Sequence, residues 1–303
     1  MALVDVIIPT RNRLALTLET VRSVQAQTLT DWHLWIVDDG SDDGSGDALA
    51  ATFADNSRVT VLRISNTGPQ RARVAVEQLG EAPWVALCDS DDLWFPTKLE
   101  RQLVLGDEAD LVLCWHEWFR PDGTVRSTSR PMTTSKPSVL LSNNMSTPLI
   151  RREFLRSIGG LGPPDGLRPT PSCDNTELYL RLLAHGRVAV VPDVLVRCRD
   201  HAGERTSDGS SSLRGAEDLE AVLRHHADLL RDHPSENALL WARAGARMVE
   251  AGRTRAGLGH LSRGTAMAPS MAQRASLVKE FGPFVVKSLG KAALRLGRSR
   301  GAR

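Results

Sequence analysis

Three carboxylates stand close together in the first half of the chain. Asp89, Asp91 and Asp92 follow the apolar run Trp84 to Cys88, in the segment Leu-Cys-Asp-Ser-Asp-Asp-Leu-Trp-Phe-Pro. Carboxylates held this close repel one another, and a hard divalent cation, which prefers oxygen ligands, relieves that repulsion. The spacing therefore predicts a site for a divalent metal ion together with a phosphate-containing ligand.

Two other polar segments follow apolar runs in the same way. Pro9-Thr10-Arg11-Asn12 comes after Val4 to Ile8, and Asp38-Asp39-Gly40-Ser41 comes after Leu34 to Val37. In open parallel sheets, ligands bind beyond the carboxyl ends of the strands. We therefore expect these segments to meet the acidic cluster at one edge of a sheet.

The elements that must position these segments alternate along the chain. Runs rich in β-branched residues predict strands, and Leu14, Leu18, Val21 and Val24 form the apolar stripe of a helix between the first two. The predicted strands are Val4 to Ile8, Leu34 to Val37, Val59 to Ile64, Trp84 to Cys88 and Leu111 to Trp115. Such alternation predicts an α/β fold with a mostly parallel central sheet flanked by helices. After residue 116 the rhythm is less regular, with a helix at 177–184 and a strand at 188–191.

Length and composition suit a large core with an appendage. The 303 residues are 41% hydrophobic, and we divide them into a main domain at 1–205 (with halves at 1–110 and 111–205), a Gly- and Ser-rich linker at 206–212, a helical region at 213–280 and a tail at 281–303. Cys88, Cys114, Cys173 and Cys198 form no CxxC pair, which predicts buried, reduced thiols.

Charge divides unevenly between the tail and the rest of the chain. The formal charge is +2, but residues 281–303 hold six basic and no acidic side chains, so the rest carries 32 basic and 36 acidic ones, a charge of −4. This balance does not favour a nucleic-acid partner. Lys287, Lys291, Arg295 and Arg298 recur at helical spacing, so residues 284–303 predict either a peripheral membrane contact or a solvated end.

The amino terminus has no basic leader, and eighteen apolar residues nowhere run together. We therefore expect a cytoplasmic protein, with the tail offering a peripheral contact at the inner face of the membrane. A homo-oligomer is compatible with the sequence.

Five segments, in order, resemble inverting glycosyltransferases of family 2, which have the GT-A fold and use nucleotide sugars. The segments are Ile-Ile-Pro-Thr-Arg-Asn, Val-Asp-Asp-Gly-Ser-Asp-Asp-Gly-Ser, Asn66 to Arg73, Asp-Ser-Asp-Asp-Leu-Trp-Phe-Pro-Thr-Lys-Leu, and Glu177 to Leu182 with Arg199-Asp-His201 after it. The resemblance covers roughly residues 1–205 and implies a nucleotide-binding half at 1–110 and an acceptor half at 111–205. It implies transfer of a sugar from a UDP- or dTDP-type donor to a hydroxyl acceptor in a glycan, a lipid carrier or a small metabolite.

The resemblance also assigns roles to single residues. Asp39 would contact the base and Asp89 the ribose, while Asp91 and His201 would bind a Mn²⁺ or Mg²⁺ ion that bridges the donor phosphates. The full set of expected donor-binding residues is Pro9, Thr10, Arg11, Asp39, Arg73, Asp89, Ser90 and Asp91.

The general base is where this sequence departs from the family. The family offers Glu-Asp at the amino end of the helix that contains Glu177, with the Asp as base, but here the segment reads Cys173-Asp174-Asn175-Thr176. Asn175 matches the position of the base, and an amide does not usefully accept a proton near neutral pH. The substitute is Asp174, with Glu177 second, and helix N-capping is an equal alternative role for Asp174.

Other ligand-binding and enzyme classes match the sequence less well. The segment from Asp39 resembles a calcium loop but has Ala50 where such a loop needs Glu. No GxGxxG follows the first strand and no GxxxxGK[ST] occurs, which disfavours dinucleotide oxidoreductases and P-loop enzymes. A nucleotidyltransferase would need a Gly-rich phosphate loop with a lysine near residues 9–14. A sugar-nucleotide-binding or scaffold protein of the same fold that has lost its base remains the alternative.

Overall fold

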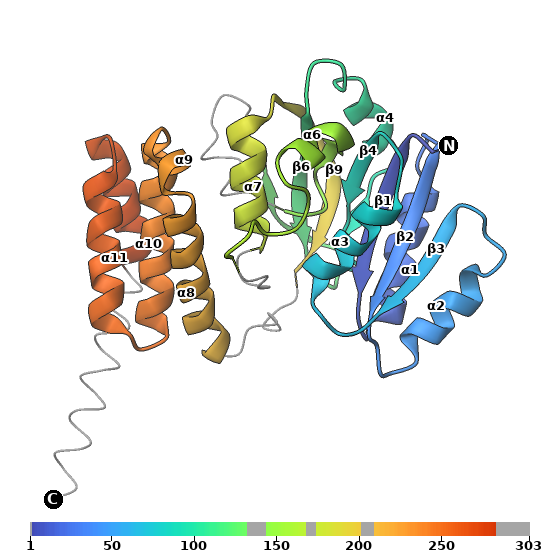
Figure 1. Cartoon of the computed structure of the whole chain (residues 1–303), viewed down its shortest axis with the longest axis horizontal. Helices are drawn as coiled ribbons and strands as arrows, with labels where there is room; N and C mark the ends of the chain where they lie inside the picture. Colours follow the sequence, from blue (N-terminus) through green and yellow to red (C-terminus); the bar gives the residue numbers. More distant parts are fainter. Residues whose placement is uncertain (1, 132–143, 168–173, 201–208, 283–303) are drawn as a thin grey trace, which may run out of the picture. The chain divides into compact units, whose positions relative to one another are not determined.

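The computed structural model describes residues 2–131, 144–167, 174–200 and 209–282. The chain divides into two compact units, Met1–Gly203 and Glu204–Arg303. The first unit contains the segments that carry the expected chemistry, and the second is helical in its described part (Figure 1).

The first unit is built on a nine-stranded sheet in its described residues. The strands are β1 (Val4–Thr10), β2 (Trp32–Asp39), β3 (Val59–Ile64), β4 (Trp84–Leu87), β5 (Leu93–Trp94), β6 (Leu111–Phe119), β7 (Val125–Ser129), β8 (Leu149–Arg151) and β9 (Val188–Arg199). They are ordered β3-β2-β1-β4-β8-β6-β9-β5, and β7 pairs with β6. Strands β3, β2, β1 and β4 are mutually parallel, as the alternation predicts.

The second half of the sheet is mixed. The three-residue strand β8 lies between β4 and β6 and is antiparallel to both, while β9 runs parallel to β6. Strands β5 and β7 add antiparallel edges. The α/β class is therefore confirmed, with the parallel arrangement concentrated in the half that the regular alternation predicts.

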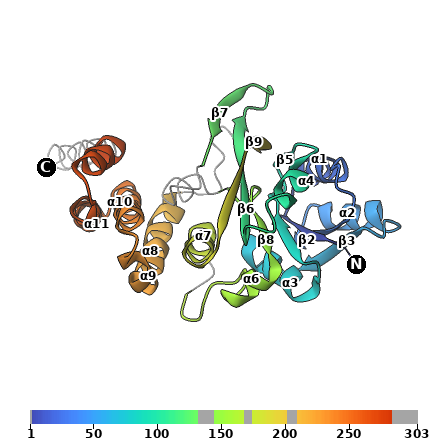
Figure 2. The same cartoon turned by 90° about the horizontal axis from the view of Figure 1, so that it is seen from above.

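Helices cover both faces of this sheet (Figure 2). Helices α1 (Leu14–Gln25), α2 (Ser45–Phe53) and α4 (Lys98–Leu103) lie on one face, and α3 (Pro69–Leu79), α6 (Arg152–Ser157) and α7 (Asp174–His185) lie on the other. The predicted stripe on α1 is confirmed, because Val21 and Val24 are buried and Leu14 and Leu18 pack against the same core.

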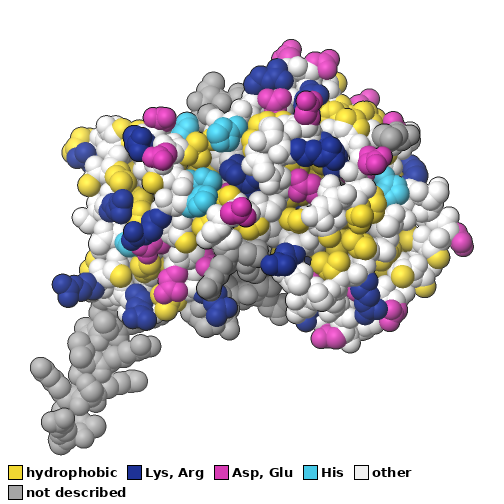
Figure 3. All heavy atoms as spheres, in the orientation of Figure 1, with side chains coloured by type: hydrophobic (Ala, Val, Ile, Leu, Met, Phe, Trp, Pro, Cys, Tyr) yellow, Lys and Arg dark blue, Asp and Glu magenta, His cyan; other side chains and the backbone are white. Residues whose placement is uncertain are grey.

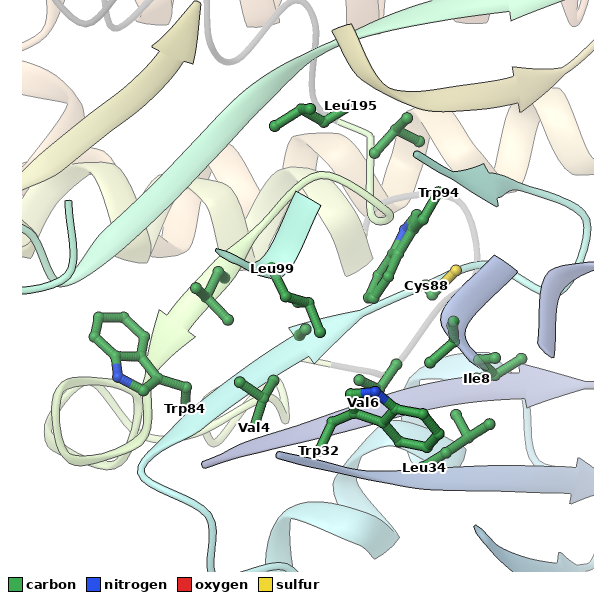
Figure 4. Close-up of a cluster of buried hydrophobic side chains, with 14 of the residues drawn as sticks. Val4, Val6, Ile8, Trp32, Leu34, Trp84, Cys88, Trp94, Leu99 and Leu195 are labelled. Atoms are coloured by element: carbon green, nitrogen blue, oxygen red, sulfur yellow. The ribbon is translucent and has the colours of Figure 1, made fainter. Parts of the chain in front are cut away.

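The core on the α1 face gathers side chains from strands far apart in sequence. Ile8, Leu34 and Cys88 from β1, β2 and the end of β4 meet Trp94 and Leu99 from β5 and α4 (Figure 4). Burial of these apolar groups fixes the strands in register. The loops after β1, β2 and β4 consequently leave the sheet at the same edge, since Thr10 pairs with Asp38 and Ile7 with Leu87.

The described part of the second unit packs helices in a row. They are α8 (Gly209–His225), α9 (Ala227–Arg231), α10 (Pro234–Glu250), α11 (Thr254–Met267) and a further helical stretch at 271–282. Helix α8 begins inside the linker expected at 206–212. Helices α10 and α11 approach closely, because a Cβ on Gly245 would lie 2.6 Å from the carbonyl oxygen of Gly257. The tail from residue 283 lies outside the described residues.

The surface and the helices bear on two further expectations. On the face shown in Figure 3, basic and acidic side chains are interspersed. In the described ranges, every helix is too short or too polar to cross a membrane. Cys88, Cys114 and Cys198 are buried free thiols, as expected, and Cys173 lies outside the described residues.

Candidate functional site

The loops after β1 and β2 are clamped together by Asn12. Its backbone has φ 51°, and its backbone N–H donates to Ser41 Oγ at 2.9 Å. Its side chain donates to Asp42 Oδ1 at 2.7 Å and accepts from the Asp42 backbone N–H at 3.0 Å. These reciprocal bonds fix the two loops relative to each other at the edge where the expected site lies.

The expected nucleoside contacts at the end of β1 are in this edge. Pro9 and Thr10 are the buried last residues of β1, and the hydroxyls of Thr10 and Thr17 lie 2.6 Å apart. Arg11 is exposed, with its guanidinium 3.8 Å from the Asp42 carboxylate. Arg11 therefore lies at the surface of this loop, while Pro9 and Thr10 are buried at its base.

Asp39 links the end of β2 to the start of α3. Its two carboxylate oxygens accept from the backbone N–H groups of Thr67, at 2.7 Å, and Gly68, at 2.8 Å. Gly68 precedes the first residue of α3, so a carboxylate here complements the positive end of the helix. Asp39 thus anchors the Asn66–Arg73 segment beside the edge and retains lone pairs for a ligand donor.

Arg73 and Asp89, both expected at the donor, form an ion pair. Arg73 Nη2 donates to Asp89 Oδ1 at 2.6 Å. The Arg73 side chain is 5% exposed and that of Asp89 36% exposed, so the pair runs from the body of α3 to the surface of the site. Ser90, the next expected residue, is buried.

A second ion pair was missed by sequence reasoning. Arg13 Nη1 donates to Asp91 Oδ2 at 2.8 Å and so joins the residue before α1 to the loop after β4. One signal in the sequence points to it. A basic residue at a helix N-terminus is unfavourable with respect to the helix dipole, which suggests that Arg13 is kept there for a nearby carboxylate or an anionic ligand.

The third carboxylate of the cluster is in a different environment. Asp92 is 4% exposed, and its oxygens are bonded to the Ser146 hydroxyl and the Arg199 backbone N–H. Burial, with the charges of Asp89 and Asp91, raises the pKa of the Asp92 carboxyl well above its usual range. The ion pairs with Arg13 and Arg73 thus offset the repulsion in the cluster, so crowding alone does not require a cation.

The expected base region lies at the start of α7. Asp174 is the first residue of this helix and Asn175 the second. Glu177 is buried, and both its oxygens accept from Arg181, at 2.7 and 2.8 Å. Arg181 also donates to the carbonyls of residues 158, 160 and 162. Glu177 therefore orients an arginine that holds the loop after α6.

A metal ion at this edge would have few protein ligands. Among the described residues, no group of three or more His, Cys, Asp or Glu side chains is arranged to hold a metal. His201 lies outside the described residues. Asp91 supplies the carboxylate oxygens that Mn²⁺ and Mg²⁺ prefer, and Mg²⁺ sites commonly use one or two carboxylates with phosphates and waters. The chemistry of Asp91 fits a cation bound together with a diphosphate.

The sequence itself decides the family. A family model described as Glycosyl transferase family 2 matches residues 5–160, just over half of the chain. The chain belongs to this family. This match confirms the resemblance to the family, and it contains four of the five segments, all but the one at 177–201. The described edge belongs to a glycosyltransferase domain.

Individual relatives agree with the family. Chondroitin synthase of Escherichia coli is 30% identical over 158 residues, which cover 51% of this chain and 21% of that protein. Across the curated relatives, the aligned part covers from 17% to 41% of their length. The match therefore spans less than half of the length of each of these relatives.

Solved structures share the fold over almost the whole chain. TarS 1–349 of S. aureus in complex with UDP-GlcNAc has a TM-score of 0.60 at 17% identity, covering 98% of this chain and 92% of that one. Mannosyltransferase PcManGT of Pyrobaculum calidifontis, in complex with GDP-Man and Mn²⁺, has a TM-score of 0.59 at 18% identity, covering 95% and 86%. The GT-A fold expected from the sequence is confirmed.

Proposed function

We propose that this chain transfers one sugar from a UDP- or dTDP-type donor to a hydroxyl acceptor, with inversion and with a divalent cation. The observation that carries the proposal is the pair of contacts Arg73–Asp89 and Arg13–Asp91, at the edge where β1, β2 and β4 end. Two cations and two carboxylates at one strand edge suit a ligand that brings both signs of charge.

A nucleotide-sugar with its cation is such a ligand. In the protein without ligand, Arg13 and Arg73 neutralise the charges of Asp91 and Asp89. Guanidinium groups bind phosphate oxygens equally well. Arg13 and Arg73 would bind the oxygens of a diphosphate and Asp91 would hold the Mn²⁺ or Mg²⁺, which would supply Lewis-acid stabilisation of a leaving nucleoside diphosphate. Net charge at the site then changes little on binding.

The nucleoside would lie against the loops after β1 and β2. Asp39 is fixed by two backbone N–H groups, so its remaining lone pairs are directed by the fold and suit an imide N–H of a uracil- or thymine-type base. Pro9, Thr10 and Arg11 border this position, and Asp89 is the candidate for the ribose.

Inversion requires a base that takes the acceptor proton on the face opposite the leaving group. Asp174 is our choice. Glu177 is a poor base because it is buried and both its oxygens already accept hydrogen bonds from Arg181. Asn175 does not accept a proton usefully and is proposed to contact the acceptor.

The acceptor is proposed to be a hydroxyl of a glycan, a lipid carrier or a small metabolite, and the reaction to be cytoplasmic. TarS bound to UDP-GlcNAc and PcManGT bound to GDP-Man and Mn²⁺ support a nucleotide-sugar donor. The six basic side chains of the tail support a peripheral contact with an anionic membrane.

Ligand binding tests the donor and the metal. A panel of UDP-, dTDP- and GDP-sugars is screened by thermal shift with and without Mn²⁺, because a ligand that binds the native state raises Tm. We expect a Mn²⁺-dependent shift with a UDP- or dTDP-sugar that Asp91→Asn abolishes and Asp107→Asn, an exposed aspartate elsewhere, preserves. An unchanged shift in Asp91→Asn would remove the metal role.

Turnover tests the base and separates the enzyme from a scaffold. Release of nucleoside diphosphate is measured with Mn²⁺ and a sugar acceptor panel. We expect Asp174→Asn to bind donor normally and to lose about 100-fold in kcat, the usual order for a general base. Full turnover in Asp174→Asn would remove it from the mechanism, and donor binding without turnover in the wild type would favour the scaffold function.

A further inference from the structure

Asp92 differs from the two carboxylates beside it because it faces the interior. Its Oδ2 accepts from Ser146 Oγ at 2.5 Å and its Oδ1 from the Arg199 backbone N–H at 3.2 Å. Its own carbonyl oxygen accepts from the Thr20 hydroxyl at 2.8 Å. In the described part of the chain, Asp92 is in no ion pair with Lys, Arg or His. Burying a carboxyl group without an ion pair costs free energy, which its hydrogen bonds must offset.

Ser146 extends the same network back to the open carboxylates. It is fully buried, and its Oγ accepts from the Asp89 backbone N–H at 2.9 Å. Its carbonyl accepts from Trp94 Nε1 at 3.1 Å, and its N–H donates to Asn144 Oδ1 at 2.7 Å. Ser146 therefore joins the beginning and the end of the acidic loop through one oxygen atom.

The end of β9 is tied to this loop as well. Arg199 Nε donates to the Asp91 carbonyl at 3.3 Å, in addition to the backbone bond to Asp92. The three partners of Asp92, at positions 20, 146 and 199, come from α1, the segment before β8 and the last residue of β9. Asp92 thus connects three parts of the chain at the candidate donor site, two through its carboxyl group and one through its backbone carbonyl.

We propose that Asp92 is a positioning residue for sugar transfer, which through Ser146 and the Arg199 backbone holds the backbone of Asp89–Asp91 in place against the end of β9. The inference rests on the proposed function. The role depends on the shape and hydrogen bonds of the side chain, and not on its charge. An asparagine keeps the same shape: its oxygen accepts from Arg199, and its amide donates to the second lone pair of Ser146 Oγ, which reverses the direction of that hydrogen bond.

Amide hydrogen exchange and donor titration on the full chain test this. In the protein without ligand, Asp92→Ala is expected to speed exchange at 88–94 and Asp92→Asn to leave it unchanged. With the UDP- or dTDP-sugar that shifts the wild type, plus Mn²⁺, Asp92→Ala is expected to raise the donor Kd about 10-fold or more, because misplaced binding groups lose affinity steeply. Asp92→Asn should stay within about 3-fold, the spread of an isosteric exchange.

Two further variants keep the test decisive. Ser146→Ala removes the shared oxygen, and it should reproduce the exchange and Kd changes even where Asp92→Ala folds poorly. Asp5→Asn is the control, because Asp5 is also a buried carboxylate, paired with Arg152, but at the opposite end of β1. It is expected to lower Tm and leave the donor Kd unchanged.

The outcomes separate the inference from the proposed function. Asp92→Asn as damaging as Asp92→Ala would show that the charge itself acts, and a wild-type Kd in both Asp92→Ala and Ser146→Ala would show that the network is not needed to position the loop. Either result overturns the proposal. If no sugar nucleotide binds the wild type, the proposed function fails, while unchanged exchange in Asp92→Ala would still overturn the network by itself.

Discussion

Arg13 Nη1 lies 2.8 Å from Asp91 Oδ2, although the two residues are 78 positions apart. The contact places a cation from the residue before α1 directly on the carboxylate proposed to hold the metal ion. Arg13 is 34% exposed and Asp91 16% exposed, so a ligand can reach the guanidinium. The pair makes Arg13 the clearest candidate for a phosphate contact that lies outside the five family segments.

Replacing Arg13 by Gln should therefore weaken donor binding. A charged hydrogen bond contributes about 1.5–3 kcal/mol, so the donor Kd should rise about 10-fold or more. The effect should shrink at high salt because part of the attraction is screened. Isothermal titration with Mn²⁺ and the donor measures it, and Arg22→Gln, an exposed residue of α1, is the control. Equal Kd values in Arg13→Gln and the wild type would contradict the phosphate role.

The Asn12 clamp predicts a difference between two small substitutions. Asn12→Ala and Asn12→Gly both remove the bonds to Asp42, but only alanine must also hold φ 51° with a Cβ. Left-handed backbone is unfavourable by roughly 1–2 kcal/mol for such a residue, so Asn12→Ala should be less stable than Asn12→Gly by about 1 kcal/mol. Urea denaturation measures both. A glycine variant as unstable as the alanine variant would show that the clamp bonds, and not the backbone, dominate.

The parts of the fold that the sequence predicts are those with local signals. Apolar β-branched runs mark β1 to β4, and the stripe through Leu14 and Val21 marks α1, because each pattern needs only neighbouring residues. Strand β8 gave no such signal. Its three residues, Leu149–Arg151, become a strand only because β4 and β6 flank them. The mixed half of the sheet could not be predicted for this reason.

In the candidate site too, local signals place some residues, while the environment of others depends on distant parts of the chain. Asp39 and Asp89 could be placed at the sheet edge because each follows an apolar strand, and the edge rule needs no tertiary detail. The burial of Asp92 depends on Ser146 and Arg199, which are 54 and 107 positions away. Adjacent aspartates thus have opposite environments, and nothing in their spacing distinguishes the open carboxylate from the buried one.

His116 predicts a loss of stability in mild acid. It is 2% exposed on β6, its Nδ1 lacks a hydrogen-bond partner among the described residues, and burial lowers its pKa from 6.5 to about 4. Below pH 6.5 the His116 side chain is protonated in the unfolded chain, whereas in the folded chain it stays neutral down to about pH 4. The free energy of unfolding should therefore fall as the pH drops from 7.5, by about 2 kcal/mol at pH 5 from this residue alone.

The variant His116→Leu isolates that contribution. Urea denaturation at pH 7.5 and pH 5 should show a smaller acid loss in His116→Leu than in the wild type. His185→Gln removes an exposed histidine of the same unit and should leave the wild-type dependence intact. The same acid loss in His116→Leu and the wild type would mean that His116 does not remain neutral in the fold.

Lys98 predicts a gain of stability in mild base. Its ammonium is fully buried, donates to Gln102 Oε1 at 2.8 Å and lies 3.9 Å from the centre of the Trp94 ring. Burial lowers its pKa from 10.5 to about 8. Between these values the unfolded chain binds more protons than the folded one, so this residue adds stability as the pH rises, about 2 kcal/mol by pH 9.5.

Buried thiols oppose this trend, so the measurement must be a difference between variants. Burial raises the pKa of Cys114 to about 11, which makes the fold less stable above pH 9, but wild type and Lys98→Met share that thiol. The stability of the wild type relative to Lys98→Met should therefore increase from pH 7.5 to pH 9.5 in urea denaturation. Lys279→Met, at an exposed lysine, should show a constant difference. A constant difference for Lys98→Met too would mean that its ammonium stays charged inside the protein.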